Sequence, residues 1–139
     1  MAGPEPATGD SATAEIVVGS GDLASAFTPS PTDAFPRVFA TARMVALMEI
    51  AAARVLQAFL GPDQMSVGVN IETTHHAATP PGAVVRAHAR YLARDGKFYA
   101  FEVWAEDETG EIGRGRHSRA IVDRSRLEAS AARRTASRR

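Results

Sequence analysis

The chain has 139 residues, 45% of them apolar, a length that supports one compact domain better than two. Sixteen basic residues balance sixteen acidic ones, so net charge does not indicate a nucleic acid or an anionic membrane as partner. The absence of cysteine excludes disulfides, thiolate metal ligands and a cysteine nucleophile. No apolar run approaches the ~20 residues of a membrane-spanning helix. We therefore expect a soluble, cytoplasmic protein with no secretion signal.

The two ends of the chain differ in composition from its centre. Residues 1–13 are rich in small residues and proline without apolar periodicity, which predicts a disordered lead-in. Residues 124–139 carry six arginines against one acidic residue, which predicts a flexible, solvated tail. The sequence therefore places a single folded domain at residues 14–123.

The first half of this domain predicts a short strand, a loop and a long helix. The strand is expected at 14–18, and three prolines make residues 28–36 a loop. A helix is predicted for residues 41–60, with Thr41 as its N-cap and Gly61 and Pro62 ending it. Apolar residues surround nearly the whole helix, so we expect it to be buried and central.

The second half alternates apolar and polar residues with a period of two. Strands are predicted at 66–77, 83–93, 98–105 and 112–122, and short turns join them. A helix that is apolar all round needs a cover, which a curved antiparallel sheet with one apolar face provides. The predicted fold is α+β: a hotdog fold, one long central helix wrapped by about five antiparallel strands. The edge strands of so small a sheet favour pairing with a second copy as a homodimer.

Glu49 is the first candidate for chemistry, because it lies in the most apolar helix of the chain. Carboxylates are rarely buried without a partner. Glu49 is either on a thin polar stripe, where it meets water or an arginine, or it is a catalytic carboxylate.

His75 and His76 are adjacent in a predicted strand, so their rings point to opposite faces and only one can face the helix. They precede a rigid turn, a place where functional side chains are often presented. A metal site is not expected, because His88, His117 and Glu49 have no ligand spacing. Thr41 lies eight positions before Glu49, about 12 Å along a helix, so the two cannot touch within one helix. If both act at one centre, the substrate lies between them or a second subunit supplies one of them.

Two motifs of the sequence resemble a known family. Phe-Ala-Thr at 39–41 with Met-Val-Ala-Leu-Met-Glu at 44–49, then Thr-His-His-Ala-Ala-Thr-Pro-Pro-Gly at 74–82, resemble the fluoroacetyl-CoA thioesterase group of hotdog proteins. The likeness continues through Glu-Ile-Gly at 111–113 and His-Ser-Arg-Ala at 117–120, and spans about residues 29–123. It implies an acyl-CoA hydrolase without a cofactor, with Thr41, Glu49 and His75 as catalytic residues near a dimer interface.

The same resemblance implies further residues that line the site. Gly68 and Arg119 match family positions there, and Phe35 matches one of two phenylalanines over the acyl pocket. Thr32 or Asp33 stands in place of the other. His76 replaces a threonine, which predicts a place at the pocket rim or in solvent.

Two other functions remain open from the sequence. One is a hotdog hydratase or dehydratase acting on acyl-CoA, although no Asp-to-His spacing indicates it. The other is a non-catalytic module that binds acyl-CoA. For a hydrolase, Glu49 is either the nucleophile or the base that activates water, and the sequence does not distinguish the two.

Overall fold

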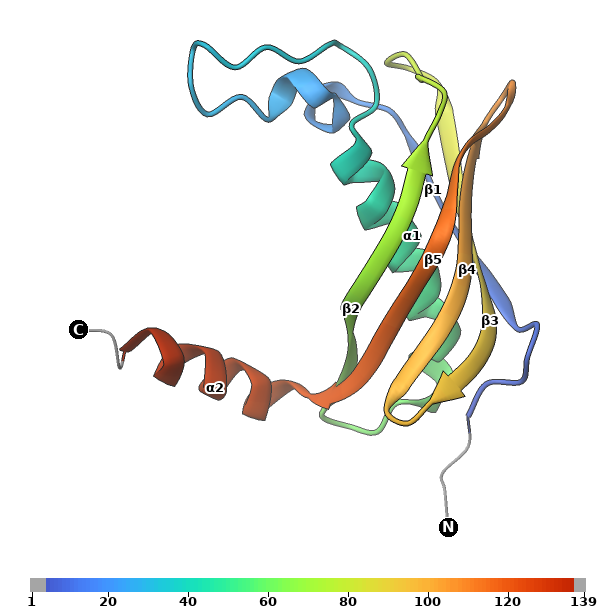
Figure 1. Cartoon of the computed structure of the whole chain (residues 1–139), viewed down its shortest axis with the longest axis vertical. Coiled ribbons are helices and arrows are strands. Elements are labelled where there is room, and N and C mark those ends of the chain that lie inside the picture. Colours follow the sequence, from blue (N-terminus) through green and yellow to red (C-terminus); the bar gives the residue numbers. More distant parts are fainter. Residues whose placement is uncertain (1–4, 137–139) are drawn as a thin grey trace.

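The computed structural model describes residues 5–136. Within these residues the chain forms five strands, two α-helices and three short 3-10 helices, with the strands and α-helices in the order strand, helix, four strands, helix (Figure 1). The elements are β1 (Ser11–Val17), η1 (Ser20–Asp22), η2 (Ala24–Ala26), α1 (Thr41–Leu56), η3 (Gln57–Phe59), β2 (Gln64–His75), β3 (Val84–Asp95), β4 (Phe98–Asp107), β5 (Gly110–Asp123) and α2 (Arg124–Ala136).

The five strands form one antiparallel sheet in the order β1-β3-β4-β5-β2, which curls around α1 as a half-barrel (Figure 1). The core lies between the concave face of the sheet and one side of the helix. On the helix Met44, Met48 and Ala51 are fully buried, and on the sheet Phe101 and Val103 are fully buried. The prediction of one helix held by one curved sheet is confirmed.

The helix is less enclosed than the sequence predicts. Its α-helical part ends at Leu56, and a 3-10 turn continues it to Phe59. Ile50 is 44% exposed, because the sheet covers only one side of α1. The other side of α1 borders the open space between the η2–α1 loop and α2, which we call the hollow side of the molecule, and no second layer of the described residues covers it (Figure 1).

The predicted flexible tail differs from the structure, because residues 124–136 form α2. Alanine, leucine, arginine and glutamate favour helices, and the Asp123 carboxylate accepts a hydrogen bond from the Arg126 N–H at 3.2 Å as a helix cap does. The helix projects away from the body (Figure 1), and none of the described α2 residues is buried. Residues 137–139 of the predicted tail lie outside the described residues.

The lead-in is also more ordered than predicted. Strand β1 begins at Ser11, and the preceding residues are attached to the end of β3. The Gly9 N–H donates to the Tyr91 carbonyl at 2.9 Å, and the Thr8 hydroxyl donates to the Leu92 carbonyl at 3.0 Å. Backbone pairing of this kind does not need apolar periodicity, so composition did not indicate it. Residues 1–4 of the predicted lead-in lie outside the described residues.

A β-bulge interrupts β2. The pairing with β5 shifts register between Gly68 and Asn70, so that Val69 is extra and 49% exposed. A bulge reverses the alternation of inward and outward side chains along a strand. Gly68 before it and His75 after it, which a regular strand would direct to opposite faces, therefore both face α1.

Candidate active site

The first group of candidate residues joins the start of α1 to the end of β2. The N-cap of α1 is Ala40, so Thr41 is the first helical residue and not the predicted cap. Its hydroxyl Oγ1 lies 2.8 Å from Nδ1 of His75. The strand presents His75 to the helix, whereas His76 contacts Glu111.

The surroundings of the His75 imidazole favour its neutral form. Burial lowers its pKa, and the adjacent His76 lowers it further, while the nearby Ala77 backbone opposes both effects. The second ring nitrogen, Nε2, is buried and meets no hydrogen-bond partner among the described residues. A buried polar atom without a partner is costly, and here it is available to a ligand or a water molecule.

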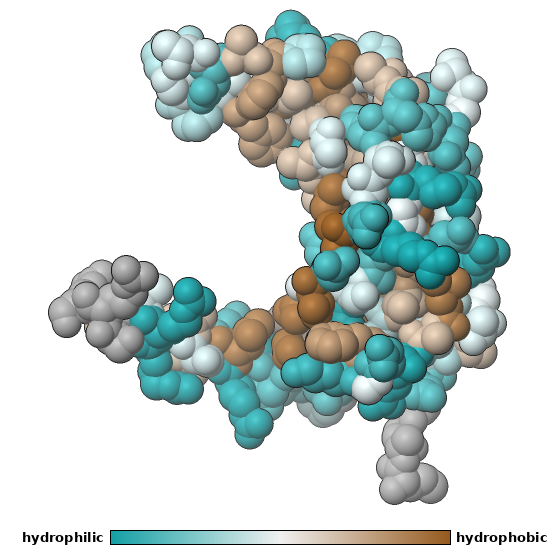
Figure 2. All heavy atoms as spheres, in the orientation of Figure 1, coloured by the Kyte–Doolittle hydropathy of each residue, from teal (hydrophilic) through white to brown (hydrophobic). Residues whose placement is uncertain are grey.

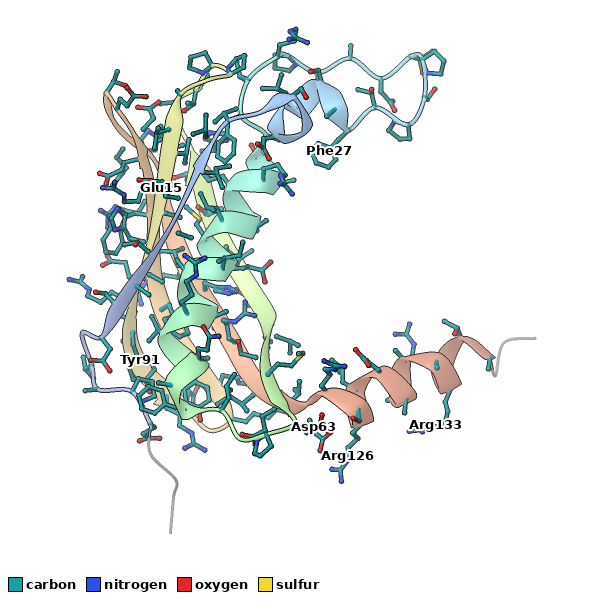
Figure 3. The ribbon with its side chains drawn as sticks, turned by 180° about the vertical axis from the view of Figure 1, so that it is seen from behind. Glu15, Phe27, Asp63, Tyr91, Arg126 and Arg133 are labelled. Atoms are coloured by element: carbon teal, nitrogen blue, oxygen red, sulfur yellow. The ribbon has the colours of Figure 1, made fainter. Side chains whose placement is uncertain are left out.

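A cavity of about 540 Å³ adjoins this group. The loop between η2 and α1 forms one wall, and the end of β2 forms the other. The lining is mostly apolar, and Phe27, Phe35 and Phe39 supply the largest side chains. In Figure 3, Phe27 points from the loop into the space between the loop and α2. The cavity therefore suits a small apolar group placed against the polar pair of Thr41 and His75.

His76 also lines this cavity, but its side chain is exposed and contacts β5. Its Nε2 lies 3.2 Å from a Glu111 carboxylate oxygen at the start of β5. The sequence analysis expected His76 at the pocket rim or in solvent, and the structure places it exposed beside the cavity.

The second group lies at the middle of α1, and Glu49 is its centre. A Glu49 oxygen, Oε1, forms an ion pair with Nη1 of Arg119 at 3.2 Å. Gly68 lies directly opposite, because a Cβ at this position would come within 2.1 Å of the same oxygen. The Glu49 side chain is 39% exposed and that of Arg119 only 7%. Gly68 therefore leaves space for the Glu49 carboxylate, and Arg119 binds this carboxylate from the sheet.

Two residues that the sequence analysis did not select hold Arg119 in turn. The guanidinium donates through Nε to the Ser66 hydroxyl and through Nη2 to the Ser66 carbonyl, each at 2.9 Å. Its Nη1 also lies 3.1 Å from Nε2 of His117. His117 and Arg119 are two positions apart on β5, so they share one face of the strand. The spacing of two residues in a predicted strand was the signal in the sequence that places His117 beside Arg119.

The two groups do not meet within one chain. No described hydrogen bond or ion pair joins Glu49 to Thr41 or His75, and the helix separates Thr41 from Glu49 by about 12 Å. The structure therefore brings together Thr41 with His75, and Glu49 with Gly68 and Arg119, but leaves them as two halves. Within residues 5–136 no group of three histidine or acidic residues could hold a metal ion. No helix in that part of the chain is long and apolar enough to span a membrane.

Comparison with solved structures defines the class of fold. A hot-dog-like protein from Thermanaerovibrio acidaminovorans superposes with a TM-score of 0.78 at 22% identity, covering 91% of each chain. A solved structure of the fluoroacetyl-CoA thioesterase FlK superposes with a TM-score of 0.88 at 36% identity, covering 94% of this chain and 98% of that one. The chain therefore has the hotdog fold of thioesterases, as predicted.

The family follows from two further matches. A family model described as fluoroacetyl-CoA-specific thioesterase matches residues 18–125. The fluoroacetyl-CoA thioesterase of Streptantibioticus cattleyicolor is 41% identical over 101 residues, 73% of each chain. This chain belongs to the fluoroacetyl-CoA-specific thioesterase family, and it is a thioester hydrolase.

Proposed function

We propose that this protein hydrolyses a small acyl-CoA thioester to the free acid and coenzyme A, at a site formed by Thr41, Glu49 and His75 near the interface of a homodimer. The observation that carries the proposal is the pair of half-sites: a neutral histidine with a hydroxyl beside an apolar cavity, and an arginine-bound carboxylate beside a glycine. Family membership supports the thioester as the bond that is broken.

Glu49 supplies the reactive oxygen in this proposal. A thioester carbonyl is electrophilic and its thiolate leaves readily, so the protein needs an activated oxygen and a place for the oxyanion. Arg119 engages Oε1, and no hydrogen bond among the described residues occupies Oε2. The carboxylate either attacks the carbonyl and expels the coenzyme A thiolate, which leaves an anhydride that water then hydrolyses, or it takes a proton from the water molecule that attacks the carbonyl. A backbone N–H near Gly68 or at the start of α1 serves the oxyanion, an interaction worth ~3 kcal/mol per donor.

His75 and Thr41 act on the same carbonyl from the other side. The lowered pKa of His75 keeps its ring neutral near pH 7, so Nε2 can accept a proton from water or polarise it. Thr41 fixes the ring orientation through Nδ1. The cavity beside this pair takes the acyl group, and its aromatic lining favours a short apolar chain.

A homodimer would bring the two half-sites together. Strand β2 forms one edge of the sheet, and such an edge pairs readily with another strand. If two copies of β2 pair antiparallel, the segment around Gly68 of one copy runs beside the His75 end of the other, and both residues face α1 of their own chain. Glu49 and Gly68 would then face Thr41 and His75 across the interface.

The hollow side of the molecule supports the same interface. Figure 2 shows hydrophobic surface along the wall between the loop and α2. Six large apolar side chains are exposed on the loop, α1, β2 and α2, the elements that border this side in Figure 1. Apolar exposure of this extent on a small domain marks an interaction surface. The six are Phe27, Phe35, Ile50, Met65, Val69 and Leu127.

Val69→Asp should convert the dimer to a monomer and abolish thiol release, because it places a charge at the centre of the β2 edge. Light scattering after size exclusion measures the mass, and the same fractions are assayed for activity. Val17→Asp is the control, since Val17 is exposed on β1 at the opposite edge of the sheet. A Val69→Asp protein that stays dimeric would contradict this interface.

Free-thiol release from a panel of acyl-CoAs of increasing chain length tests the proposed activity. Hydrolysis releases coenzyme A, whereas a hydratase or dehydratase changes the acyl chain without releasing thiol. A binding module would retain the acyl-CoA unchanged. Thiol release that is fastest with short acyl chains supports the proposal, and its absence across the panel overturns it. A cytoplasmic location stays a prediction that fits an acyl-CoA substrate.

A further inference from the structure

We propose that His117 is a positioning residue: its neutral imidazole orients Arg119, and through Arg119 it orients the Glu49 carboxylate. This inference rests on the proposed function, in which Glu49 is the reactive group. His117 is on β5, and its side chain lies in the layer between the sheet and α1, where it is buried. It does not line the cavity beside His75.

The hydrogen bonds of His117 define its tautomer. Nδ1 lies 2.7 Å from the Asn70 carbonyl, which can only accept, so Nδ1 carries the proton. Nε2 lies 3.1 Å from Nη1 of Arg119, which can only donate, so Nε2 is the acceptor. The bulge in β2 is adjacent to Asn70 and places its carbonyl at this position. Both ring nitrogens are therefore used, and the ring is neutral.

The charged groups around His117 favour this neutral state. Burial lowers its pKa and the Arg119 cation lowers it further, while the Asn70 carbonyl and the Glu49 carboxylate oppose them. From β4, the contact is the ring of Phe101, which carries no charge. A proton on Nε2 would direct an N–H at the Arg119 N–H and place two cations side by side. Protonation should therefore displace Arg119 and release Glu49.

The other contacts of Arg119 explain the importance of its contact with His117. Ser66 holds Nε and Nη2 from β2, so the guanidinium is anchored on its far side. Only His117 and Glu49 contact Nη1 among the described residues. The imidazole therefore fixes the nitrogen that reaches the carboxylate. Misplacement of a reactive group by about 1 Å can cost ~10²-fold in rate.

His117→Phe and His117→Gln separate positioning from packing. Phenylalanine keeps the ring but removes both nitrogens, so kcat should fall roughly 10²-fold with little change in KM. Glutamine offers Arg119 an amide oxygen and has no proton to gain, so it should restore kcat to within about tenfold of wild type. Its rate should also decline less steeply than that of wild type as the pH falls through the lowered pKa of His117.

His88→Phe is the matched control, because His88 is a partly buried histidine of the same sheet that contacts Glu106 and Trp104 away from Glu49. It should leave kcat unchanged. Equal rates for His117→Phe and His88→Phe would overturn the proposal. So would a His117→Gln protein as slow as His117→Phe with an unaltered pH profile.

Nitrogen NMR of the imidazoles tests the arrangement without substrate. His117 should show a protonated Nδ1 and a bare Nε2 at pH 7, and the Arg119 Nε–H signal should shift as His117 titrates. A charged ring at pH 7, or the opposite tautomer, would overturn the proposal even if His117→Phe fails to fold. If wild type releases no thiol from any acyl-CoA, the proposed function fails, while this spectrum still decides the role of His117 at Arg119.

Discussion

Glu49→Gln is expected to keep the fold and to lower kcat for thiol release by ~10²-fold or more. The amide has nearly the same shape as the carboxylate, and it still accepts a hydrogen bond from Arg119, but it is neither basic nor nucleophilic. The measurement is thiol release with a short acyl-CoA, together with the melting temperature of the variant.

Glu15→Gln is the matched control, because Glu15 is also paired with an arginine, Arg86, but lies exposed on β1 at the far edge of the sheet (Figure 3). It should retain full activity. If Glu49→Gln stays within about tenfold of wild type, equivalent to ~1.4 kcal/mol of barrier, Glu49 is structural and the proposed chemistry is wrong.

A mixture of two inactive variants tests which copies supply the halves of one site. In a heterodimer of Glu49→Gln with His75→Ala, one site carries both defects, and the other is intact if each site takes Glu49 from one copy and His75 from the other. Refolding the two together should therefore restore activity. If both residues of a site come from the same copy, each site keeps one defect and the mixture stays inactive, which would contradict the pairing proposed for β2.

His75→Ala is expected to lower kcat/KM by ~10²-fold or more, the usual scale of general acid–base catalysis. The change removes the ring that contacts Thr41 and presents Nε2 toward the cavity. His76→Thr should cost less than about tenfold and alter the preference among acyl chains, because His76 lies at the rim and pairs with Glu111. Rates across the acyl-CoA panel measure both effects.

The comparison is made near pH 8, well above the lowered pKa of His75, so that its imidazole is neutral. Because burial lowers the pKa of His75, wild-type activity that depends on its neutral form should persist below pH 6.5 and decline only as the pH approaches the lowered value. An acid-side decline that begins above 6.5 would contradict the role of His75. If His76→Thr were the more damaging change, His76 and not His75 would face the reacting carbonyl.

Much of the fold was predictable because its signals are local. The apolar run from Met44 to Leu56 and the period-two alternation after Gln64 are properties of short segments, so the helix and the four strands after it could be located to within a few residues. The turn at Asp95 and Gly96 was readable for the same reason, since Gly96 has a φ of 61° that favours glycine. The candidate residues Thr41, Glu49 and His75 came from motifs of similarly short range.

Helix α2 is the α-helix that local patterns did not predict. Its arginines and alanines indicate solvent exposure, and none of the described α2 residues is buried, but exposure does not exclude a helix. The helix begins because Asp123 caps it and the Arg124 N–H donates to the Asp63 carbonyl at 2.9 Å. The second contact joins segments sixty residues apart, which periodicity does not detect.

The sequence by itself determined one apolar helix and a set of alternating strands, because these depend on residue type and spacing, and its short motifs supplied the candidate residues of the proposed site. Only the tertiary structure decided how those side chains are grouped. The bulge at Val69 turns both Gly68 and His75 toward α1, although their spacing predicts opposite faces. Thr41 contacts His75, and Arg119 contacts Glu49, because strand pairing brings distant segments together. Such contacts depend on register, and register is set by the whole sheet.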